Sequence, residues 1–567
     1  MRRGTPSQLL TAAHLLGSVL GAVCAPSPPS YSNRGSIPKL GAVASESSVC
    51  SRIGVDLLEA GGNAADALVG TVFCVGVVGM MHSGIGGGGF MLVRASDGTY
   101  EFIDFREVAP AAAFEDMYKN NTDASLYGGL ASGVPGELRG LEYLHTNYGV
   151  LPWAQVMAPA IKVARDGFRV TEDLVRYMNT VSGDGKFFTE DPSWAIDFAP
   201  HGYRVKLNET MTRKRYADTL EVIAKEGPDA FYSGAIAKAT IAALQAANGT
   251  MTTDDLTNYT VALRKPSNIT YRGYKLTACG APAGGSVALS ALKIVESYDG
   301  FGDDSQLNLT THRLDEAIRF AYGERTNLGD PSFLEGILEY QDSMLSDATT
   351  AEIHAKISDT TSHNVSYYDP KGIESLETPG TSYVGTADKS GLAISLTTTI
   401  NTLFGSQVMV PETGVIMNNE MNDFSIPASS NAFGYIPSPA NYIRPGKRPL
   451  SSISPTIVES ADGKLYLVVG SAGGSRIITA TIQNVHNVLD RNMTTPWPWR
   501  SRACTTSSCP TRSRSSTRLG HNVTWVAPGQ STAQALRMLP NGTFSRRPAS
   551  RDRPTRAGSR SSAGRRS

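Results

Sequence analysis

The sequence predicts a layered protein of helices and sheets, which we place in the α+β class. Residues 150–260 alternate amphipathic helical stretches with loops, whereas short β-rich stretches bounded by Gly or Pro follow residue 380. The alternation of these patterns is too irregular for a Rossmann fold or a barrel. With 567 residues and 41% hydrophobic side chains, the chain is long enough to bury a large core.

The first 25 residues predict entry into the secretory pathway. Arg2 and Arg3 precede an apolar run over residues 9–25, which ends in small residues placed like a signal-peptidase site. At about 17 residues, this run lies at the short limit for spanning a bilayer, so a cleaved signal peptide and a retained signal anchor both stay open. Residues 26–38 form a Pro/Ser-rich linker.

Several elements can be placed from their patterns. Residues 41–78 predict a short apolar strand and then a helix, whose small residues over 57–67 allow close packing. The Gly-rich run 83–90 lacks the Lys and Ser/Thr of a phosphate-binding loop, and we interpret it as a tight turn into a strand over 90–93. Amphipathic helices are also predicted over 154–166 and 235–247, and strands over 392–399, 415–418 and 465–470.

Charge is distributed unevenly along the chain. Residues 500–567 contain 14 Arg, no Lys and one Asp, so the preceding residues hold 38 basic and 51 acidic side chains, a net charge of −13. An acidic body argues against nucleic-acid binding. Ten Asn-x-Ser/Thr sequons favour an exported glycoprotein at the cell surface or secreted: Asn120, Asn208, Asn248, Asn258, Asn268, Asn308, Asn364, Asn492, Asn522 and Asn541.

Five blocks in the second half carry the strongest functional signal. They occupy residues 379–383, 397–406, 418–424, 448–452 and 470–474. In order and spacing, they resemble the γ-glutamyltransferase family, also called γ-glutamyltranspeptidases or glutathione hydrolases, within the N-terminal nucleophile hydrolases. The resemblance covers about residues 38–499.

The resemblance implies a four-layer αββα sandwich, an architecture that periodicity alone does not give. It also implies a proenzyme that cuts itself between Gly380 and Thr381. The products would be a large subunit, residues 39–380, and a small subunit with a core over 381–499, interleaved as a heterodimer.

The chemistry expected at the new N-terminus explains why a Thr is needed there. The α-amino group of a freed Thr381 has a reference pKa of about 7.7–8.0 and can activate the hydroxyl of the same residue. The resemblance assigns Thr399 a hydrogen bond to this nucleophile, and it assigns Gly473 and Gly474 the oxyanion hole. Taken alone, these stretches indicate only a surface loop, a strand residue and a turn.

A γ-glutamyl donor carries an α-carboxylate and an α-ammonium, so its site needs cationic donors beside anionic acceptors. The resemblance assigns the carboxylate to a guanidinium, which can hold it through two hydrogen bonds, and to two hydroxyls: Arg106, Ser451 and Ser452. It assigns the ammonium to one amide and two acids: Asn401, Glu420 and Asp423. Without the resemblance, the acids indicate a solvated turn and the serines a helix cap.

The activity implied is cleavage of the γ-glutamyl amide of glutathione or its conjugates through a Thr acyl-enzyme. Water, an amino acid or a dipeptide then accepts the γ-glutamyl group. This chemistry requires no cofactor, and no cluster has convincing metal-ligand spacing. The alternatives are an inactive, unprocessed surface glycoprotein of the same fold, a relative preferring leukotriene-type conjugates, and a cephalosporin-acylase-like hydrolase. The retained Arg106, Glu420 and Asp423 argue against the last.

The family has a disulfide at the positions of Cys50 and Cys74, which lie at the two ends of an Ala/Gly-rich helical segment. Two buried thiols are the alternative interpretation.

The chain departs from the family pattern in two places. Tyr383 stands two residues after the nucleophile, where the family usually has His, so we expect altered maturation and activity. The resemblance also stops near Trp499, and residues 503–510 match the family's Arg-Leu-His-His-Gln-Leu-Leu-Pro segment read one base out of frame in GC-rich codons. We therefore expect frameshifts in the stretch 500–567, with a basic disordered tail as the alternative.

Overall fold

The computed structural model describes residues 40–371, 380–427, 437–493, 532–539 and 542–546. The predicted signal segment, the linker over 26–38 and most of the stretch 500–567 lie outside these residues. None of the helices in the described ranges combines the length and the apolar character that crossing a membrane needs.

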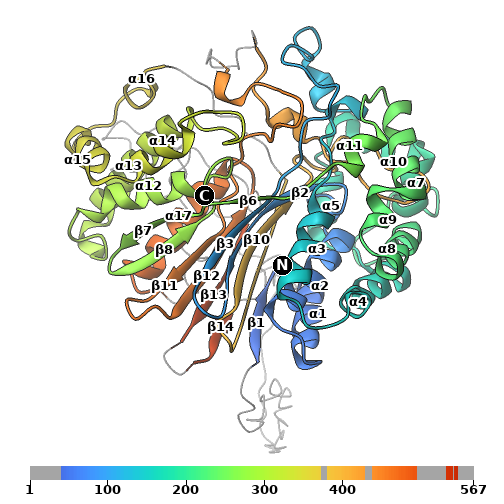
Figure 1. Ribbon diagram of the computed structural model, residues 1–567, viewed down its shortest axis with the longest axis horizontal. Helices are drawn as coiled ribbons and strands as arrows, with labels where there is room; N and C mark the ends of the chain where they lie inside the picture. Colours follow the sequence, from blue (N-terminus) through green and yellow to red (C-terminus); the bar gives the residue numbers. More distant parts are fainter. Residues whose placement is uncertain (1–39, 372–379, 428–436, 494–531, 540–541, 547–567) are drawn as a thin grey trace, which may run out of the picture. The chain divides into compact units, whose positions relative to one another are not determined.

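Two six-stranded sheets, each antiparallel throughout, form the centre of the protein (Figure 1). The first has the order β1-β9-β10-β2-β3-β6. Its strands are β1 (Gly41–Ala44), β2 (Gly88–Arg94), β3 (Tyr100–Phe105), β6 (Ala262–Arg264), β9 (Ser382–Asp388) and β10 (Ala393–Thr399).

The second sheet has the order β14-β13-β12-β11-β8-β7. Its strands are β7 (Ser267–Tyr271), β8 (Tyr274–Ala278), β11 (Thr456–Glu459), β12 (Leu465–Ala472), β13 (Thr532–Met538) and β14 (Phe544–Arg546). A separate short pair consists of β4 (Phe168–Arg169) and β5 (Thr210–Met211).

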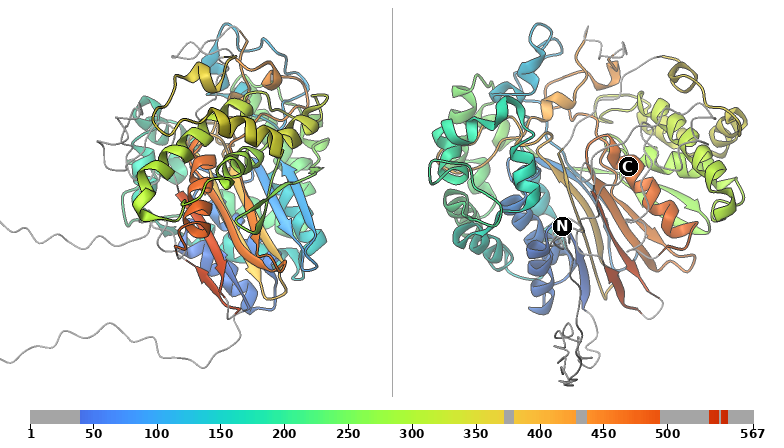
Figure 2. Two further views of the ribbon diagram at one scale, coloured as in Figure 1. Left: turned by 90° about the vertical axis from the view of Figure 1, so that its left-hand side faces the viewer. Right: turned by 180° about the vertical axis from the view of Figure 1, so that it is seen from behind.

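Helices cover the outer face of each sheet, as the view from behind shows (Figure 2, right). Those on the first sheet are α1 (Ser48–Glu59), α2 (Ala64–Val78), α3 (Glu137–Tyr148), α4 (Trp153–Asp166), α5 (Glu172–Met178), α6 (Phe187–Glu190), α7 (Pro192–Phe198), α8 (Lys214–Glu226), α9 (Asp229–Tyr232), α10 (Gly234–Ala246) and α11 (Thr253–Thr257). Those on the second are α12 (Gly285–Glu296), α13 (Leu307–Arg325), α14 (Ile337–Met344), α15 (Asp347–Lys356), α16 (Val365–Tyr368) and α17 (Arg476–Leu489).

The three largest apolar cores of the described residues separate these layers. The largest lies between the first sheet and its helices, and a second lies between the other sheet and its helices. The third fills the space between the sheets, where Phe90 and Leu92 meet Val468 and Leu536. The layers therefore follow the order helix, sheet, sheet, helix, and the predicted αββα sandwich is confirmed.

Segments before and after Gly380 contribute strands to both sheets. In the first sheet, β9 pairs with β1 and β10 pairs with β2, so the hairpin of β9 and β10 lies between strands from the earlier part of the chain. In the second, β11 pairs with β8 from the earlier part. Backbone hydrogen bonds would thus hold the two segments together after a break at residue 380.

The helix expected through residues 57–67 is two helices. The first, α1, ends at Glu59, and the backbone φ of Gly61 is +96°. Asn63 then starts α2 with a capping box, in which its side chain accepts from the N–H of Asp66 and the Asp66 carboxylate accepts from the N–H of Asn63. The run of small residues suggested one continuous helix, but Gly61 and the Asn63 cap end one helix and start the next.

The strand predicted over 415–418 is wrong, since only Ile416 forms an isolated bridge, to Met409. The neighbouring N–H groups bond elsewhere: Met417 donates to the Val408 carbonyl and Asn418 to the Gly86 carbonyl. The other predicted elements are confirmed, with every boundary within two residues of the prediction. They are the helices over 154–166 and 235–247 and the strands over 90–93, 392–399 and 465–470.

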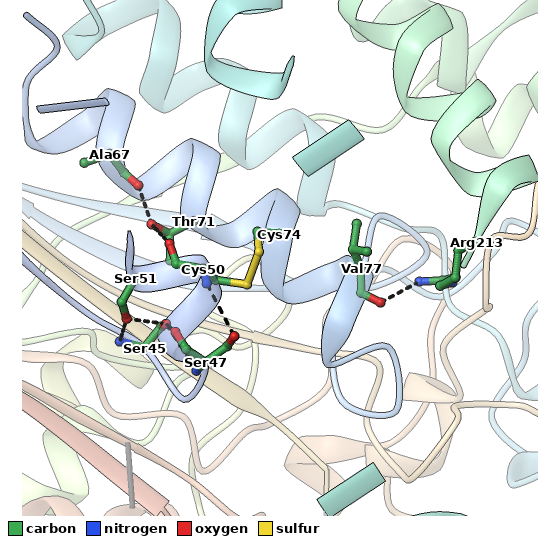
Figure 3. Close-up of a disulfide and its surroundings, with 9 residues drawn as sticks. All are labelled: Ser45, Ser47, Cys50, Ser51, Ala67, Thr71, Cys74, Val77 and Arg213. Carbon is green, nitrogen blue, oxygen red and sulfur yellow. Dashed lines mark hydrogen bonds between the residues drawn. A yellow bond between two sulfur atoms is a disulfide. The ribbon is translucent and has the colours of Figure 1, made fainter. Parts of the chain in front are cut away.

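A disulfide joins Cys50 on α1 to Cys74 on α2, with 5.3 Å between the Cα atoms (Figure 3). It links two packed helices, instead of lying at the ends of one helical segment. In the same region, the Thr71 hydroxyl donates to the carbonyl of Ala67 at 2.6 Å. Closing a loop across 24 residues stabilises the folded chain by about 3 kcal/mol.

Candidate active site

The candidate nucleophile and its predicted partner lie side by side at one edge of the first sheet. Thr381 directly precedes β9, and Thr399 is the last residue of β10. The register pairs Thr398 with Ser382, which places Thr399 opposite Thr381. Thr381 is only 5% exposed.

The two neighbouring strands bring Arg106 to the same edge. Strand β2 begins at Gly88, which pairs with Thr399. Strand β3 ends at Phe105, whose partner on β2 is Gly89, and Arg106 follows directly. A side chain on Gly89 is excluded, because its Cβ would lie 2.1 Å from the Thr397 carbonyl oxygen.

Thr399 contacts the carbonyl of the Gly380–Thr381 peptide. Thr399 Oγ1 donates to the Gly380 carbonyl oxygen at 2.7 Å and accepts from the Asn401 N–H at 2.8 Å. The second bond directs the hydroxyl proton toward Gly380. In the uncleaved chain, Thr399 therefore polarises the carbonyl before the nucleophile.

Only glycine fits the position before Thr381. The φ of Gly380 is +134°, which side chains rarely tolerate. A Cβ there would also lie 2.4 Å from the carbonyl oxygen of Asn401. Asn401 itself has φ +71°, and its side-chain Nδ2 donates to the Asn419 carbonyl at 2.9 Å.

A buried cluster of charges occupies the end of β3. The guanidinium of Arg106, 1% exposed, forms ion pairs with Glu420 and Asp423. These two acids lie three residues apart on a 3₁₀ turn, Glu420–Asp423, so they face the same side. Asn418 supports the turn by accepting from the N–H of Glu420 at 2.9 Å.

A third acid, Glu107, belongs to this cluster, although no motif in the sequence had singled it out. Glu107 is fully buried beside Arg106. Burial raises the pKa of the Glu107 carboxyl to about 7, although the Arg106 guanidinium opposes the shift. Burial likewise raises the pKa of Glu420 well above its ordinary value, and the neighbouring Glu107 adds to that shift. The available signal was an acid next to an Arg at the end of a buried strand.

Each predicted serine accepts a hydrogen bond through its hydroxyl oxygen. Ser451 Oγ accepts from the Ile453 N–H at 3.2 Å, and Ser452 Oγ accepts from Arg325 Nη2 at 3.3 Å. A hydroxyl that accepts in this way keeps its proton available for a second partner.

Arg325 is a further buried guanidinium that was not predicted from the sequence. Burial lowers its pKa, and the charges of Asp423 and Arg106 also act on it, which places it beside the ion-paired cluster. Arg325 is the last residue of helix α13, and no pattern in that helix marked it as part of the site.

Gly473 and Gly474 connect β12 of the second sheet to α17, with φ of +128° and +64°. They lie at the N-terminal, positively polarised end of that helix. The start of β9 packs against the same strand, because a Cβ on Gly470 would meet the Tyr383 ring at 2.1 Å. This contact brings the glycine pair toward the edge that carries Thr381.

Tyr383 is fully buried, and its ring packs against Gly470 of β12. Its hydroxyl forms a hydrogen bond of 2.9 Å with the Ser395 hydroxyl. Burial raises the pKa of this phenol, which keeps it neutral. Among all the residues that the structure describes, no group of three or more His, Cys, Asp or Glu is arranged to hold a metal ion.

Comparisons with known proteins show the family of the chain. The profile of the family described as Gamma-glutamyltranspeptidase matches residues 50–497. The chain is 58% identical to a glutathione hydrolase proenzyme of Arthroderma benhamiae over 80% of each chain. It is 51% identical to a glutathione hydrolase of Aspergillus flavus, over 89% of this chain and 87% of that one.

Two solved structures share the fold. A cephalosporin acylase from Bacillus halodurans matches with a TM-score of 0.77 and 26% identity, covering 91% of this chain and 96% of that chain. A Helicobacter pylori γ-glutamyltranspeptidase matches with a TM-score of 0.52 and 30% identity, covering 58% of this chain and 95% of that chain.

The sandwich and its threonine-bearing edge define an enzyme of the N-terminal nucleophile hydrolase class. Within that class, the chain belongs to the γ-glutamyltranspeptidase family.

Proposed function

We propose that the protein is a glutathione hydrolase that cuts itself at Gly380–Thr381 and then cleaves γ-glutamyl amides with Thr381. The hydrogen bond from Thr399 to the Gly380 carbonyl is the observation that carries this proposal, since it prepares that peptide for attack. The identities of 58% and 51% to two glutathione hydrolases support the same activity.

Self-cleavage begins when Thr381 Oγ1 attacks the carbonyl carbon of Gly380. The hydroxyl proton passes to the main-chain nitrogen of Thr381 as the C–N bond breaks, which leaves an ester between Gly380 and the Thr381 side chain. Water hydrolyses this ester, giving a Gly380 carboxylate and a free α-amino group on Thr381. The Thr399 hydroxyl stabilises the oxyanion of the attack, and typical oxyanion donors contribute about 10²–10³ in rate.

Catalysis reuses the freed residue. The α-amino group accepts the proton of Thr381 Oγ1 while this oxygen attacks the γ-carbonyl of the donor. Gly473 and Gly474 donate N–H groups to the oxyanion, and the amine leaving group, cysteinylglycine from glutathione, takes up a proton. Water, an amino acid or a dipeptide then attacks the γ-glutamyl ester and regenerates Thr381.

The charged cluster selects an intact amino-acid end on the donor. The α-carboxylate binds to Arg106 and to the available protons of Ser451 and Ser452. The α-ammonium binds to Glu420 and Asp423, which are ion-paired with Arg106 in its absence. Because the acids outnumber the guanidinium groups that pair with them, a cation is favoured beside them.

The similarity to a cephalosporin acylase raises a second candidate activity. A donor without an α-ammonium would leave Glu420 and Asp423 paired only with Arg106, so the cluster favours γ-glutamyl donors. Bulkier glutathione conjugates, such as leukotriene-type conjugates, present the same γ-glutamyl end, and the cluster does not discriminate against them.

We further propose that the enzyme works on the extracellular side, at the cell surface or secreted, as a glycoprotein. The support is the disulfide Cys50–Cys74 and the exposure of every sequon asparagine within the described residues. These are Asn120, Asn208, Asn248, Asn258, Asn268, Asn308, Asn364 and Asn492. Protein secreted from a eukaryotic host should lose mass on treatment with peptide N-glycosidase; an unchanged mass would contradict the proposal.

N-terminal sequencing of the smaller band, with Thr381→Ala as the control, tests the proposed activity. We expect a band that starts at Thr381, is absent from the control, and accompanies release of cysteinylglycine from glutathione. A single uncleaved band in both proteins would instead support the inactive glycoprotein.

A further inference from the structure

A closed ring of buried charges lies behind the residues proposed to bind the donor. Arg264 donates from Nε to Asp104 and from Nη2 to Asp330 at 2.8 Å. Arg448 completes the ring: its main-chain N–H donates to Asp330 at 2.9 Å, and the Nε of its side chain lies 3.2 Å from Asp104 Oδ1. The side chains of both acids are 0% exposed, and those of both arginines are at most 10% exposed.

Asp104 also holds the backbone of Arg106. Its Oδ1 accepts from the Arg106 N–H at 3.0 Å. On the other side of Arg106, the Tyr259 hydroxyl donates to the main-chain carbonyl at 2.7 Å. The residue that carries the carboxylate-binding guanidinium is therefore fixed at both of its backbone polar groups.

Arg448 begins the segment that carries the two serines. Its Nη2 donates to the Thr260 carbonyl at 2.7 Å. Further along, Asn441 accepts from the Leu450 N–H at 2.9 Å and donates to the Asp423 carbonyl at 2.7 Å. The segment 448–452 is thus tied to Asp104 at its start and to the ammonium-binding turn near its end.

Stability alone does not account for this ring. Removing four charged groups from water is costly, and replacing buried ion pairs with apolar side chains is often neutral or stabilising. The ring instead fixes the position of Arg106 relative to Arg448, because the carboxylate of Asp104 contacts both residues.

We propose that Asp104 is a positioning residue for the donor, which sets the spacing between the Arg106 guanidinium and the hydroxyls of Ser451 and Ser452. Together, the guanidinium and the two hydroxyls bind the donor's α-carboxylate. The inference rests on the proposed function and adds to it a residue that touches no substrate. Neutralising Asp104 should weaken binding of the α-carboxylate and leave the chemistry at Thr381 largely intact.

The test compares two competitive inhibitors in wild type and in the isosteric variant Asp104→Asn. L-Glutamate has the α-carboxylate, and 4-aminobutyrate is the same molecule without it. We expect the variant to mature normally, with the inhibition constant of L-glutamate and the KM of a γ-glutamyl anilide raised about tenfold and kcat changed by less than about threefold. The inhibition constant of 4-aminobutyrate should not change.

Glu459→Gln is the matched control, since it neutralises the acid of another buried pair, Arg94–Glu459, at 2.7 Å. It should lower the thermal unfolding temperature without moving either inhibition constant. Arg448→Lys keeps the ring's charge but not the planar guanidinium, and it replaces Asp104→Asn in the assay if that variant does not fold.

Two results would overturn the inference. One is an unchanged inhibition constant of L-glutamate in the variants, and the other is an equal rise for both inhibitors, which a merely structural role would give. A wild-type protein that neither matures nor turns over a γ-glutamyl anilide would instead count against the proposed function.

Discussion

Thr399 donates a hydrogen bond of 2.7 Å to the carbonyl oxygen of Gly380, the residue before the proposed nucleophile. The same hydroxyl accepts from the Asn401 N–H, so its proton has a fixed direction. The sequence resemblance suggested a bond to Thr381 itself. One side chain can serve both steps, acting on the Gly380 carbonyl before cleavage and beside the nucleophile afterwards.

Removing this donor should slow maturation. We expect Thr399→Val to reduce the rate of precursor cleavage by about 10²–10³, because an oxyanion donor is lost without a change of shape. Thr399→Ser, which keeps the hydroxyl, should mature much closer to the wild-type rate. Densitometry of the precursor band over time measures both rates.

Thr386→Val is the matched control for that experiment. It also removes a buried hydroxyl in the first sheet, which donates to the Ala64 carbonyl at 2.8 Å. It should cost about 1 kcal/mol of stability and leave the cleavage rate unchanged. Equal slowing in both Val variants would show that the Thr399 effect is general destabilisation.

A side chain at residue 380 should also block maturation. Gly380→Ala meets a φ of +134° and places Cβ 2.4 Å from the Asn401 carbonyl oxygen. Strain of about 1–3 kcal/mol that displaces the scissile carbonyl should slow cleavage at least about tenfold. Mass spectrometry of freshly purified protein gives the cleaved fraction.

Gly463→Ala provides the comparison, because Gly463 has a φ of +76° and a Cβ added there would meet no atom within 4 Å. It tests backbone strain alone in a turn distant from Thr381. Normal maturation of Gly380→Ala would show that the fit of this residue against Asn401 is not required.

Sequence patterns predicted the individual helices and strands better than they predicted the contacts between them. The amphipathic helix α4 and the strands β10 and β12 follow from local periodicity, whereas the stacking of two sheets came from the family resemblance. Periodicity records which face of an element is buried, but not which other element covers it.

The same distinction applies to the site. Short motifs identified Arg106 and Glu420, because each lies in a distinctive stretch. Asp104 and Asn441 act across the fold, on partners such as Arg448 and Asp423 that are distant in sequence. No local pattern marks such partners, and only the folded backbone brings them into contact.

Tyr383 shows how a departure from the family pattern can be absorbed by packing. We expect Gly470→Ala to destabilise the chain by about 1–3 kcal/mol, since its Cβ would meet the Tyr383 ring at 2.1 Å. Tyr383→His, with a smaller ring, should recover part of that loss in the double variant. Thermal unfolding, measured in the uncleavable Thr381→Ala background, gives the coupling between the two sites.

Additive effects of the two substitutions would contradict this interpretation. Tyr383→Phe serves as the control, because it keeps the ring and removes only the bond to Ser395, at a cost of about 1 kcal/mol. It should leave the penalty of Gly470→Ala in place.

The buried acid Glu107 should make donor binding depend on pH near neutrality. Burial raises its pKa to about 7; the Arg106 guanidinium opposes the shift, and the Asp423 carboxylate adds to it. From helix α3, the carboxyl of Glu137 also faces Glu107, and burial raises the pKa of Glu137 to about 8. Burial also raises the pKa of Glu420, and the charge of Arg106 opposes that shift.

The sign follows from the direction of the shift. A raised carboxyl pKa means that the folded protein binds the proton more tightly than the unfolded chain does. The resulting stabilisation is complete below pH 4.5, the ordinary pKa, and is lost as the pH rises through about 7. Donor affinity changes in the opposite direction, because the ionised carboxylate attracts the α-ammonium.

We therefore expect kcat/KM for a γ-glutamyl anilide to rise with pH through about 7 in the wild type, and Glu107→Gln to remove this inflection. The α-amino group of Thr381, with a reference pKa of about 7.7–8.0, should still give its own inflection in the variant. Glu324→Gln is the matched control, since burial raises the pKa of Glu324 to about 7 as well, while its carboxylate accepts from the Ser290 hydroxyl on α12. A profile that Glu107→Gln and Glu324→Gln leave equally unchanged would assign the pH dependence to Thr381 alone.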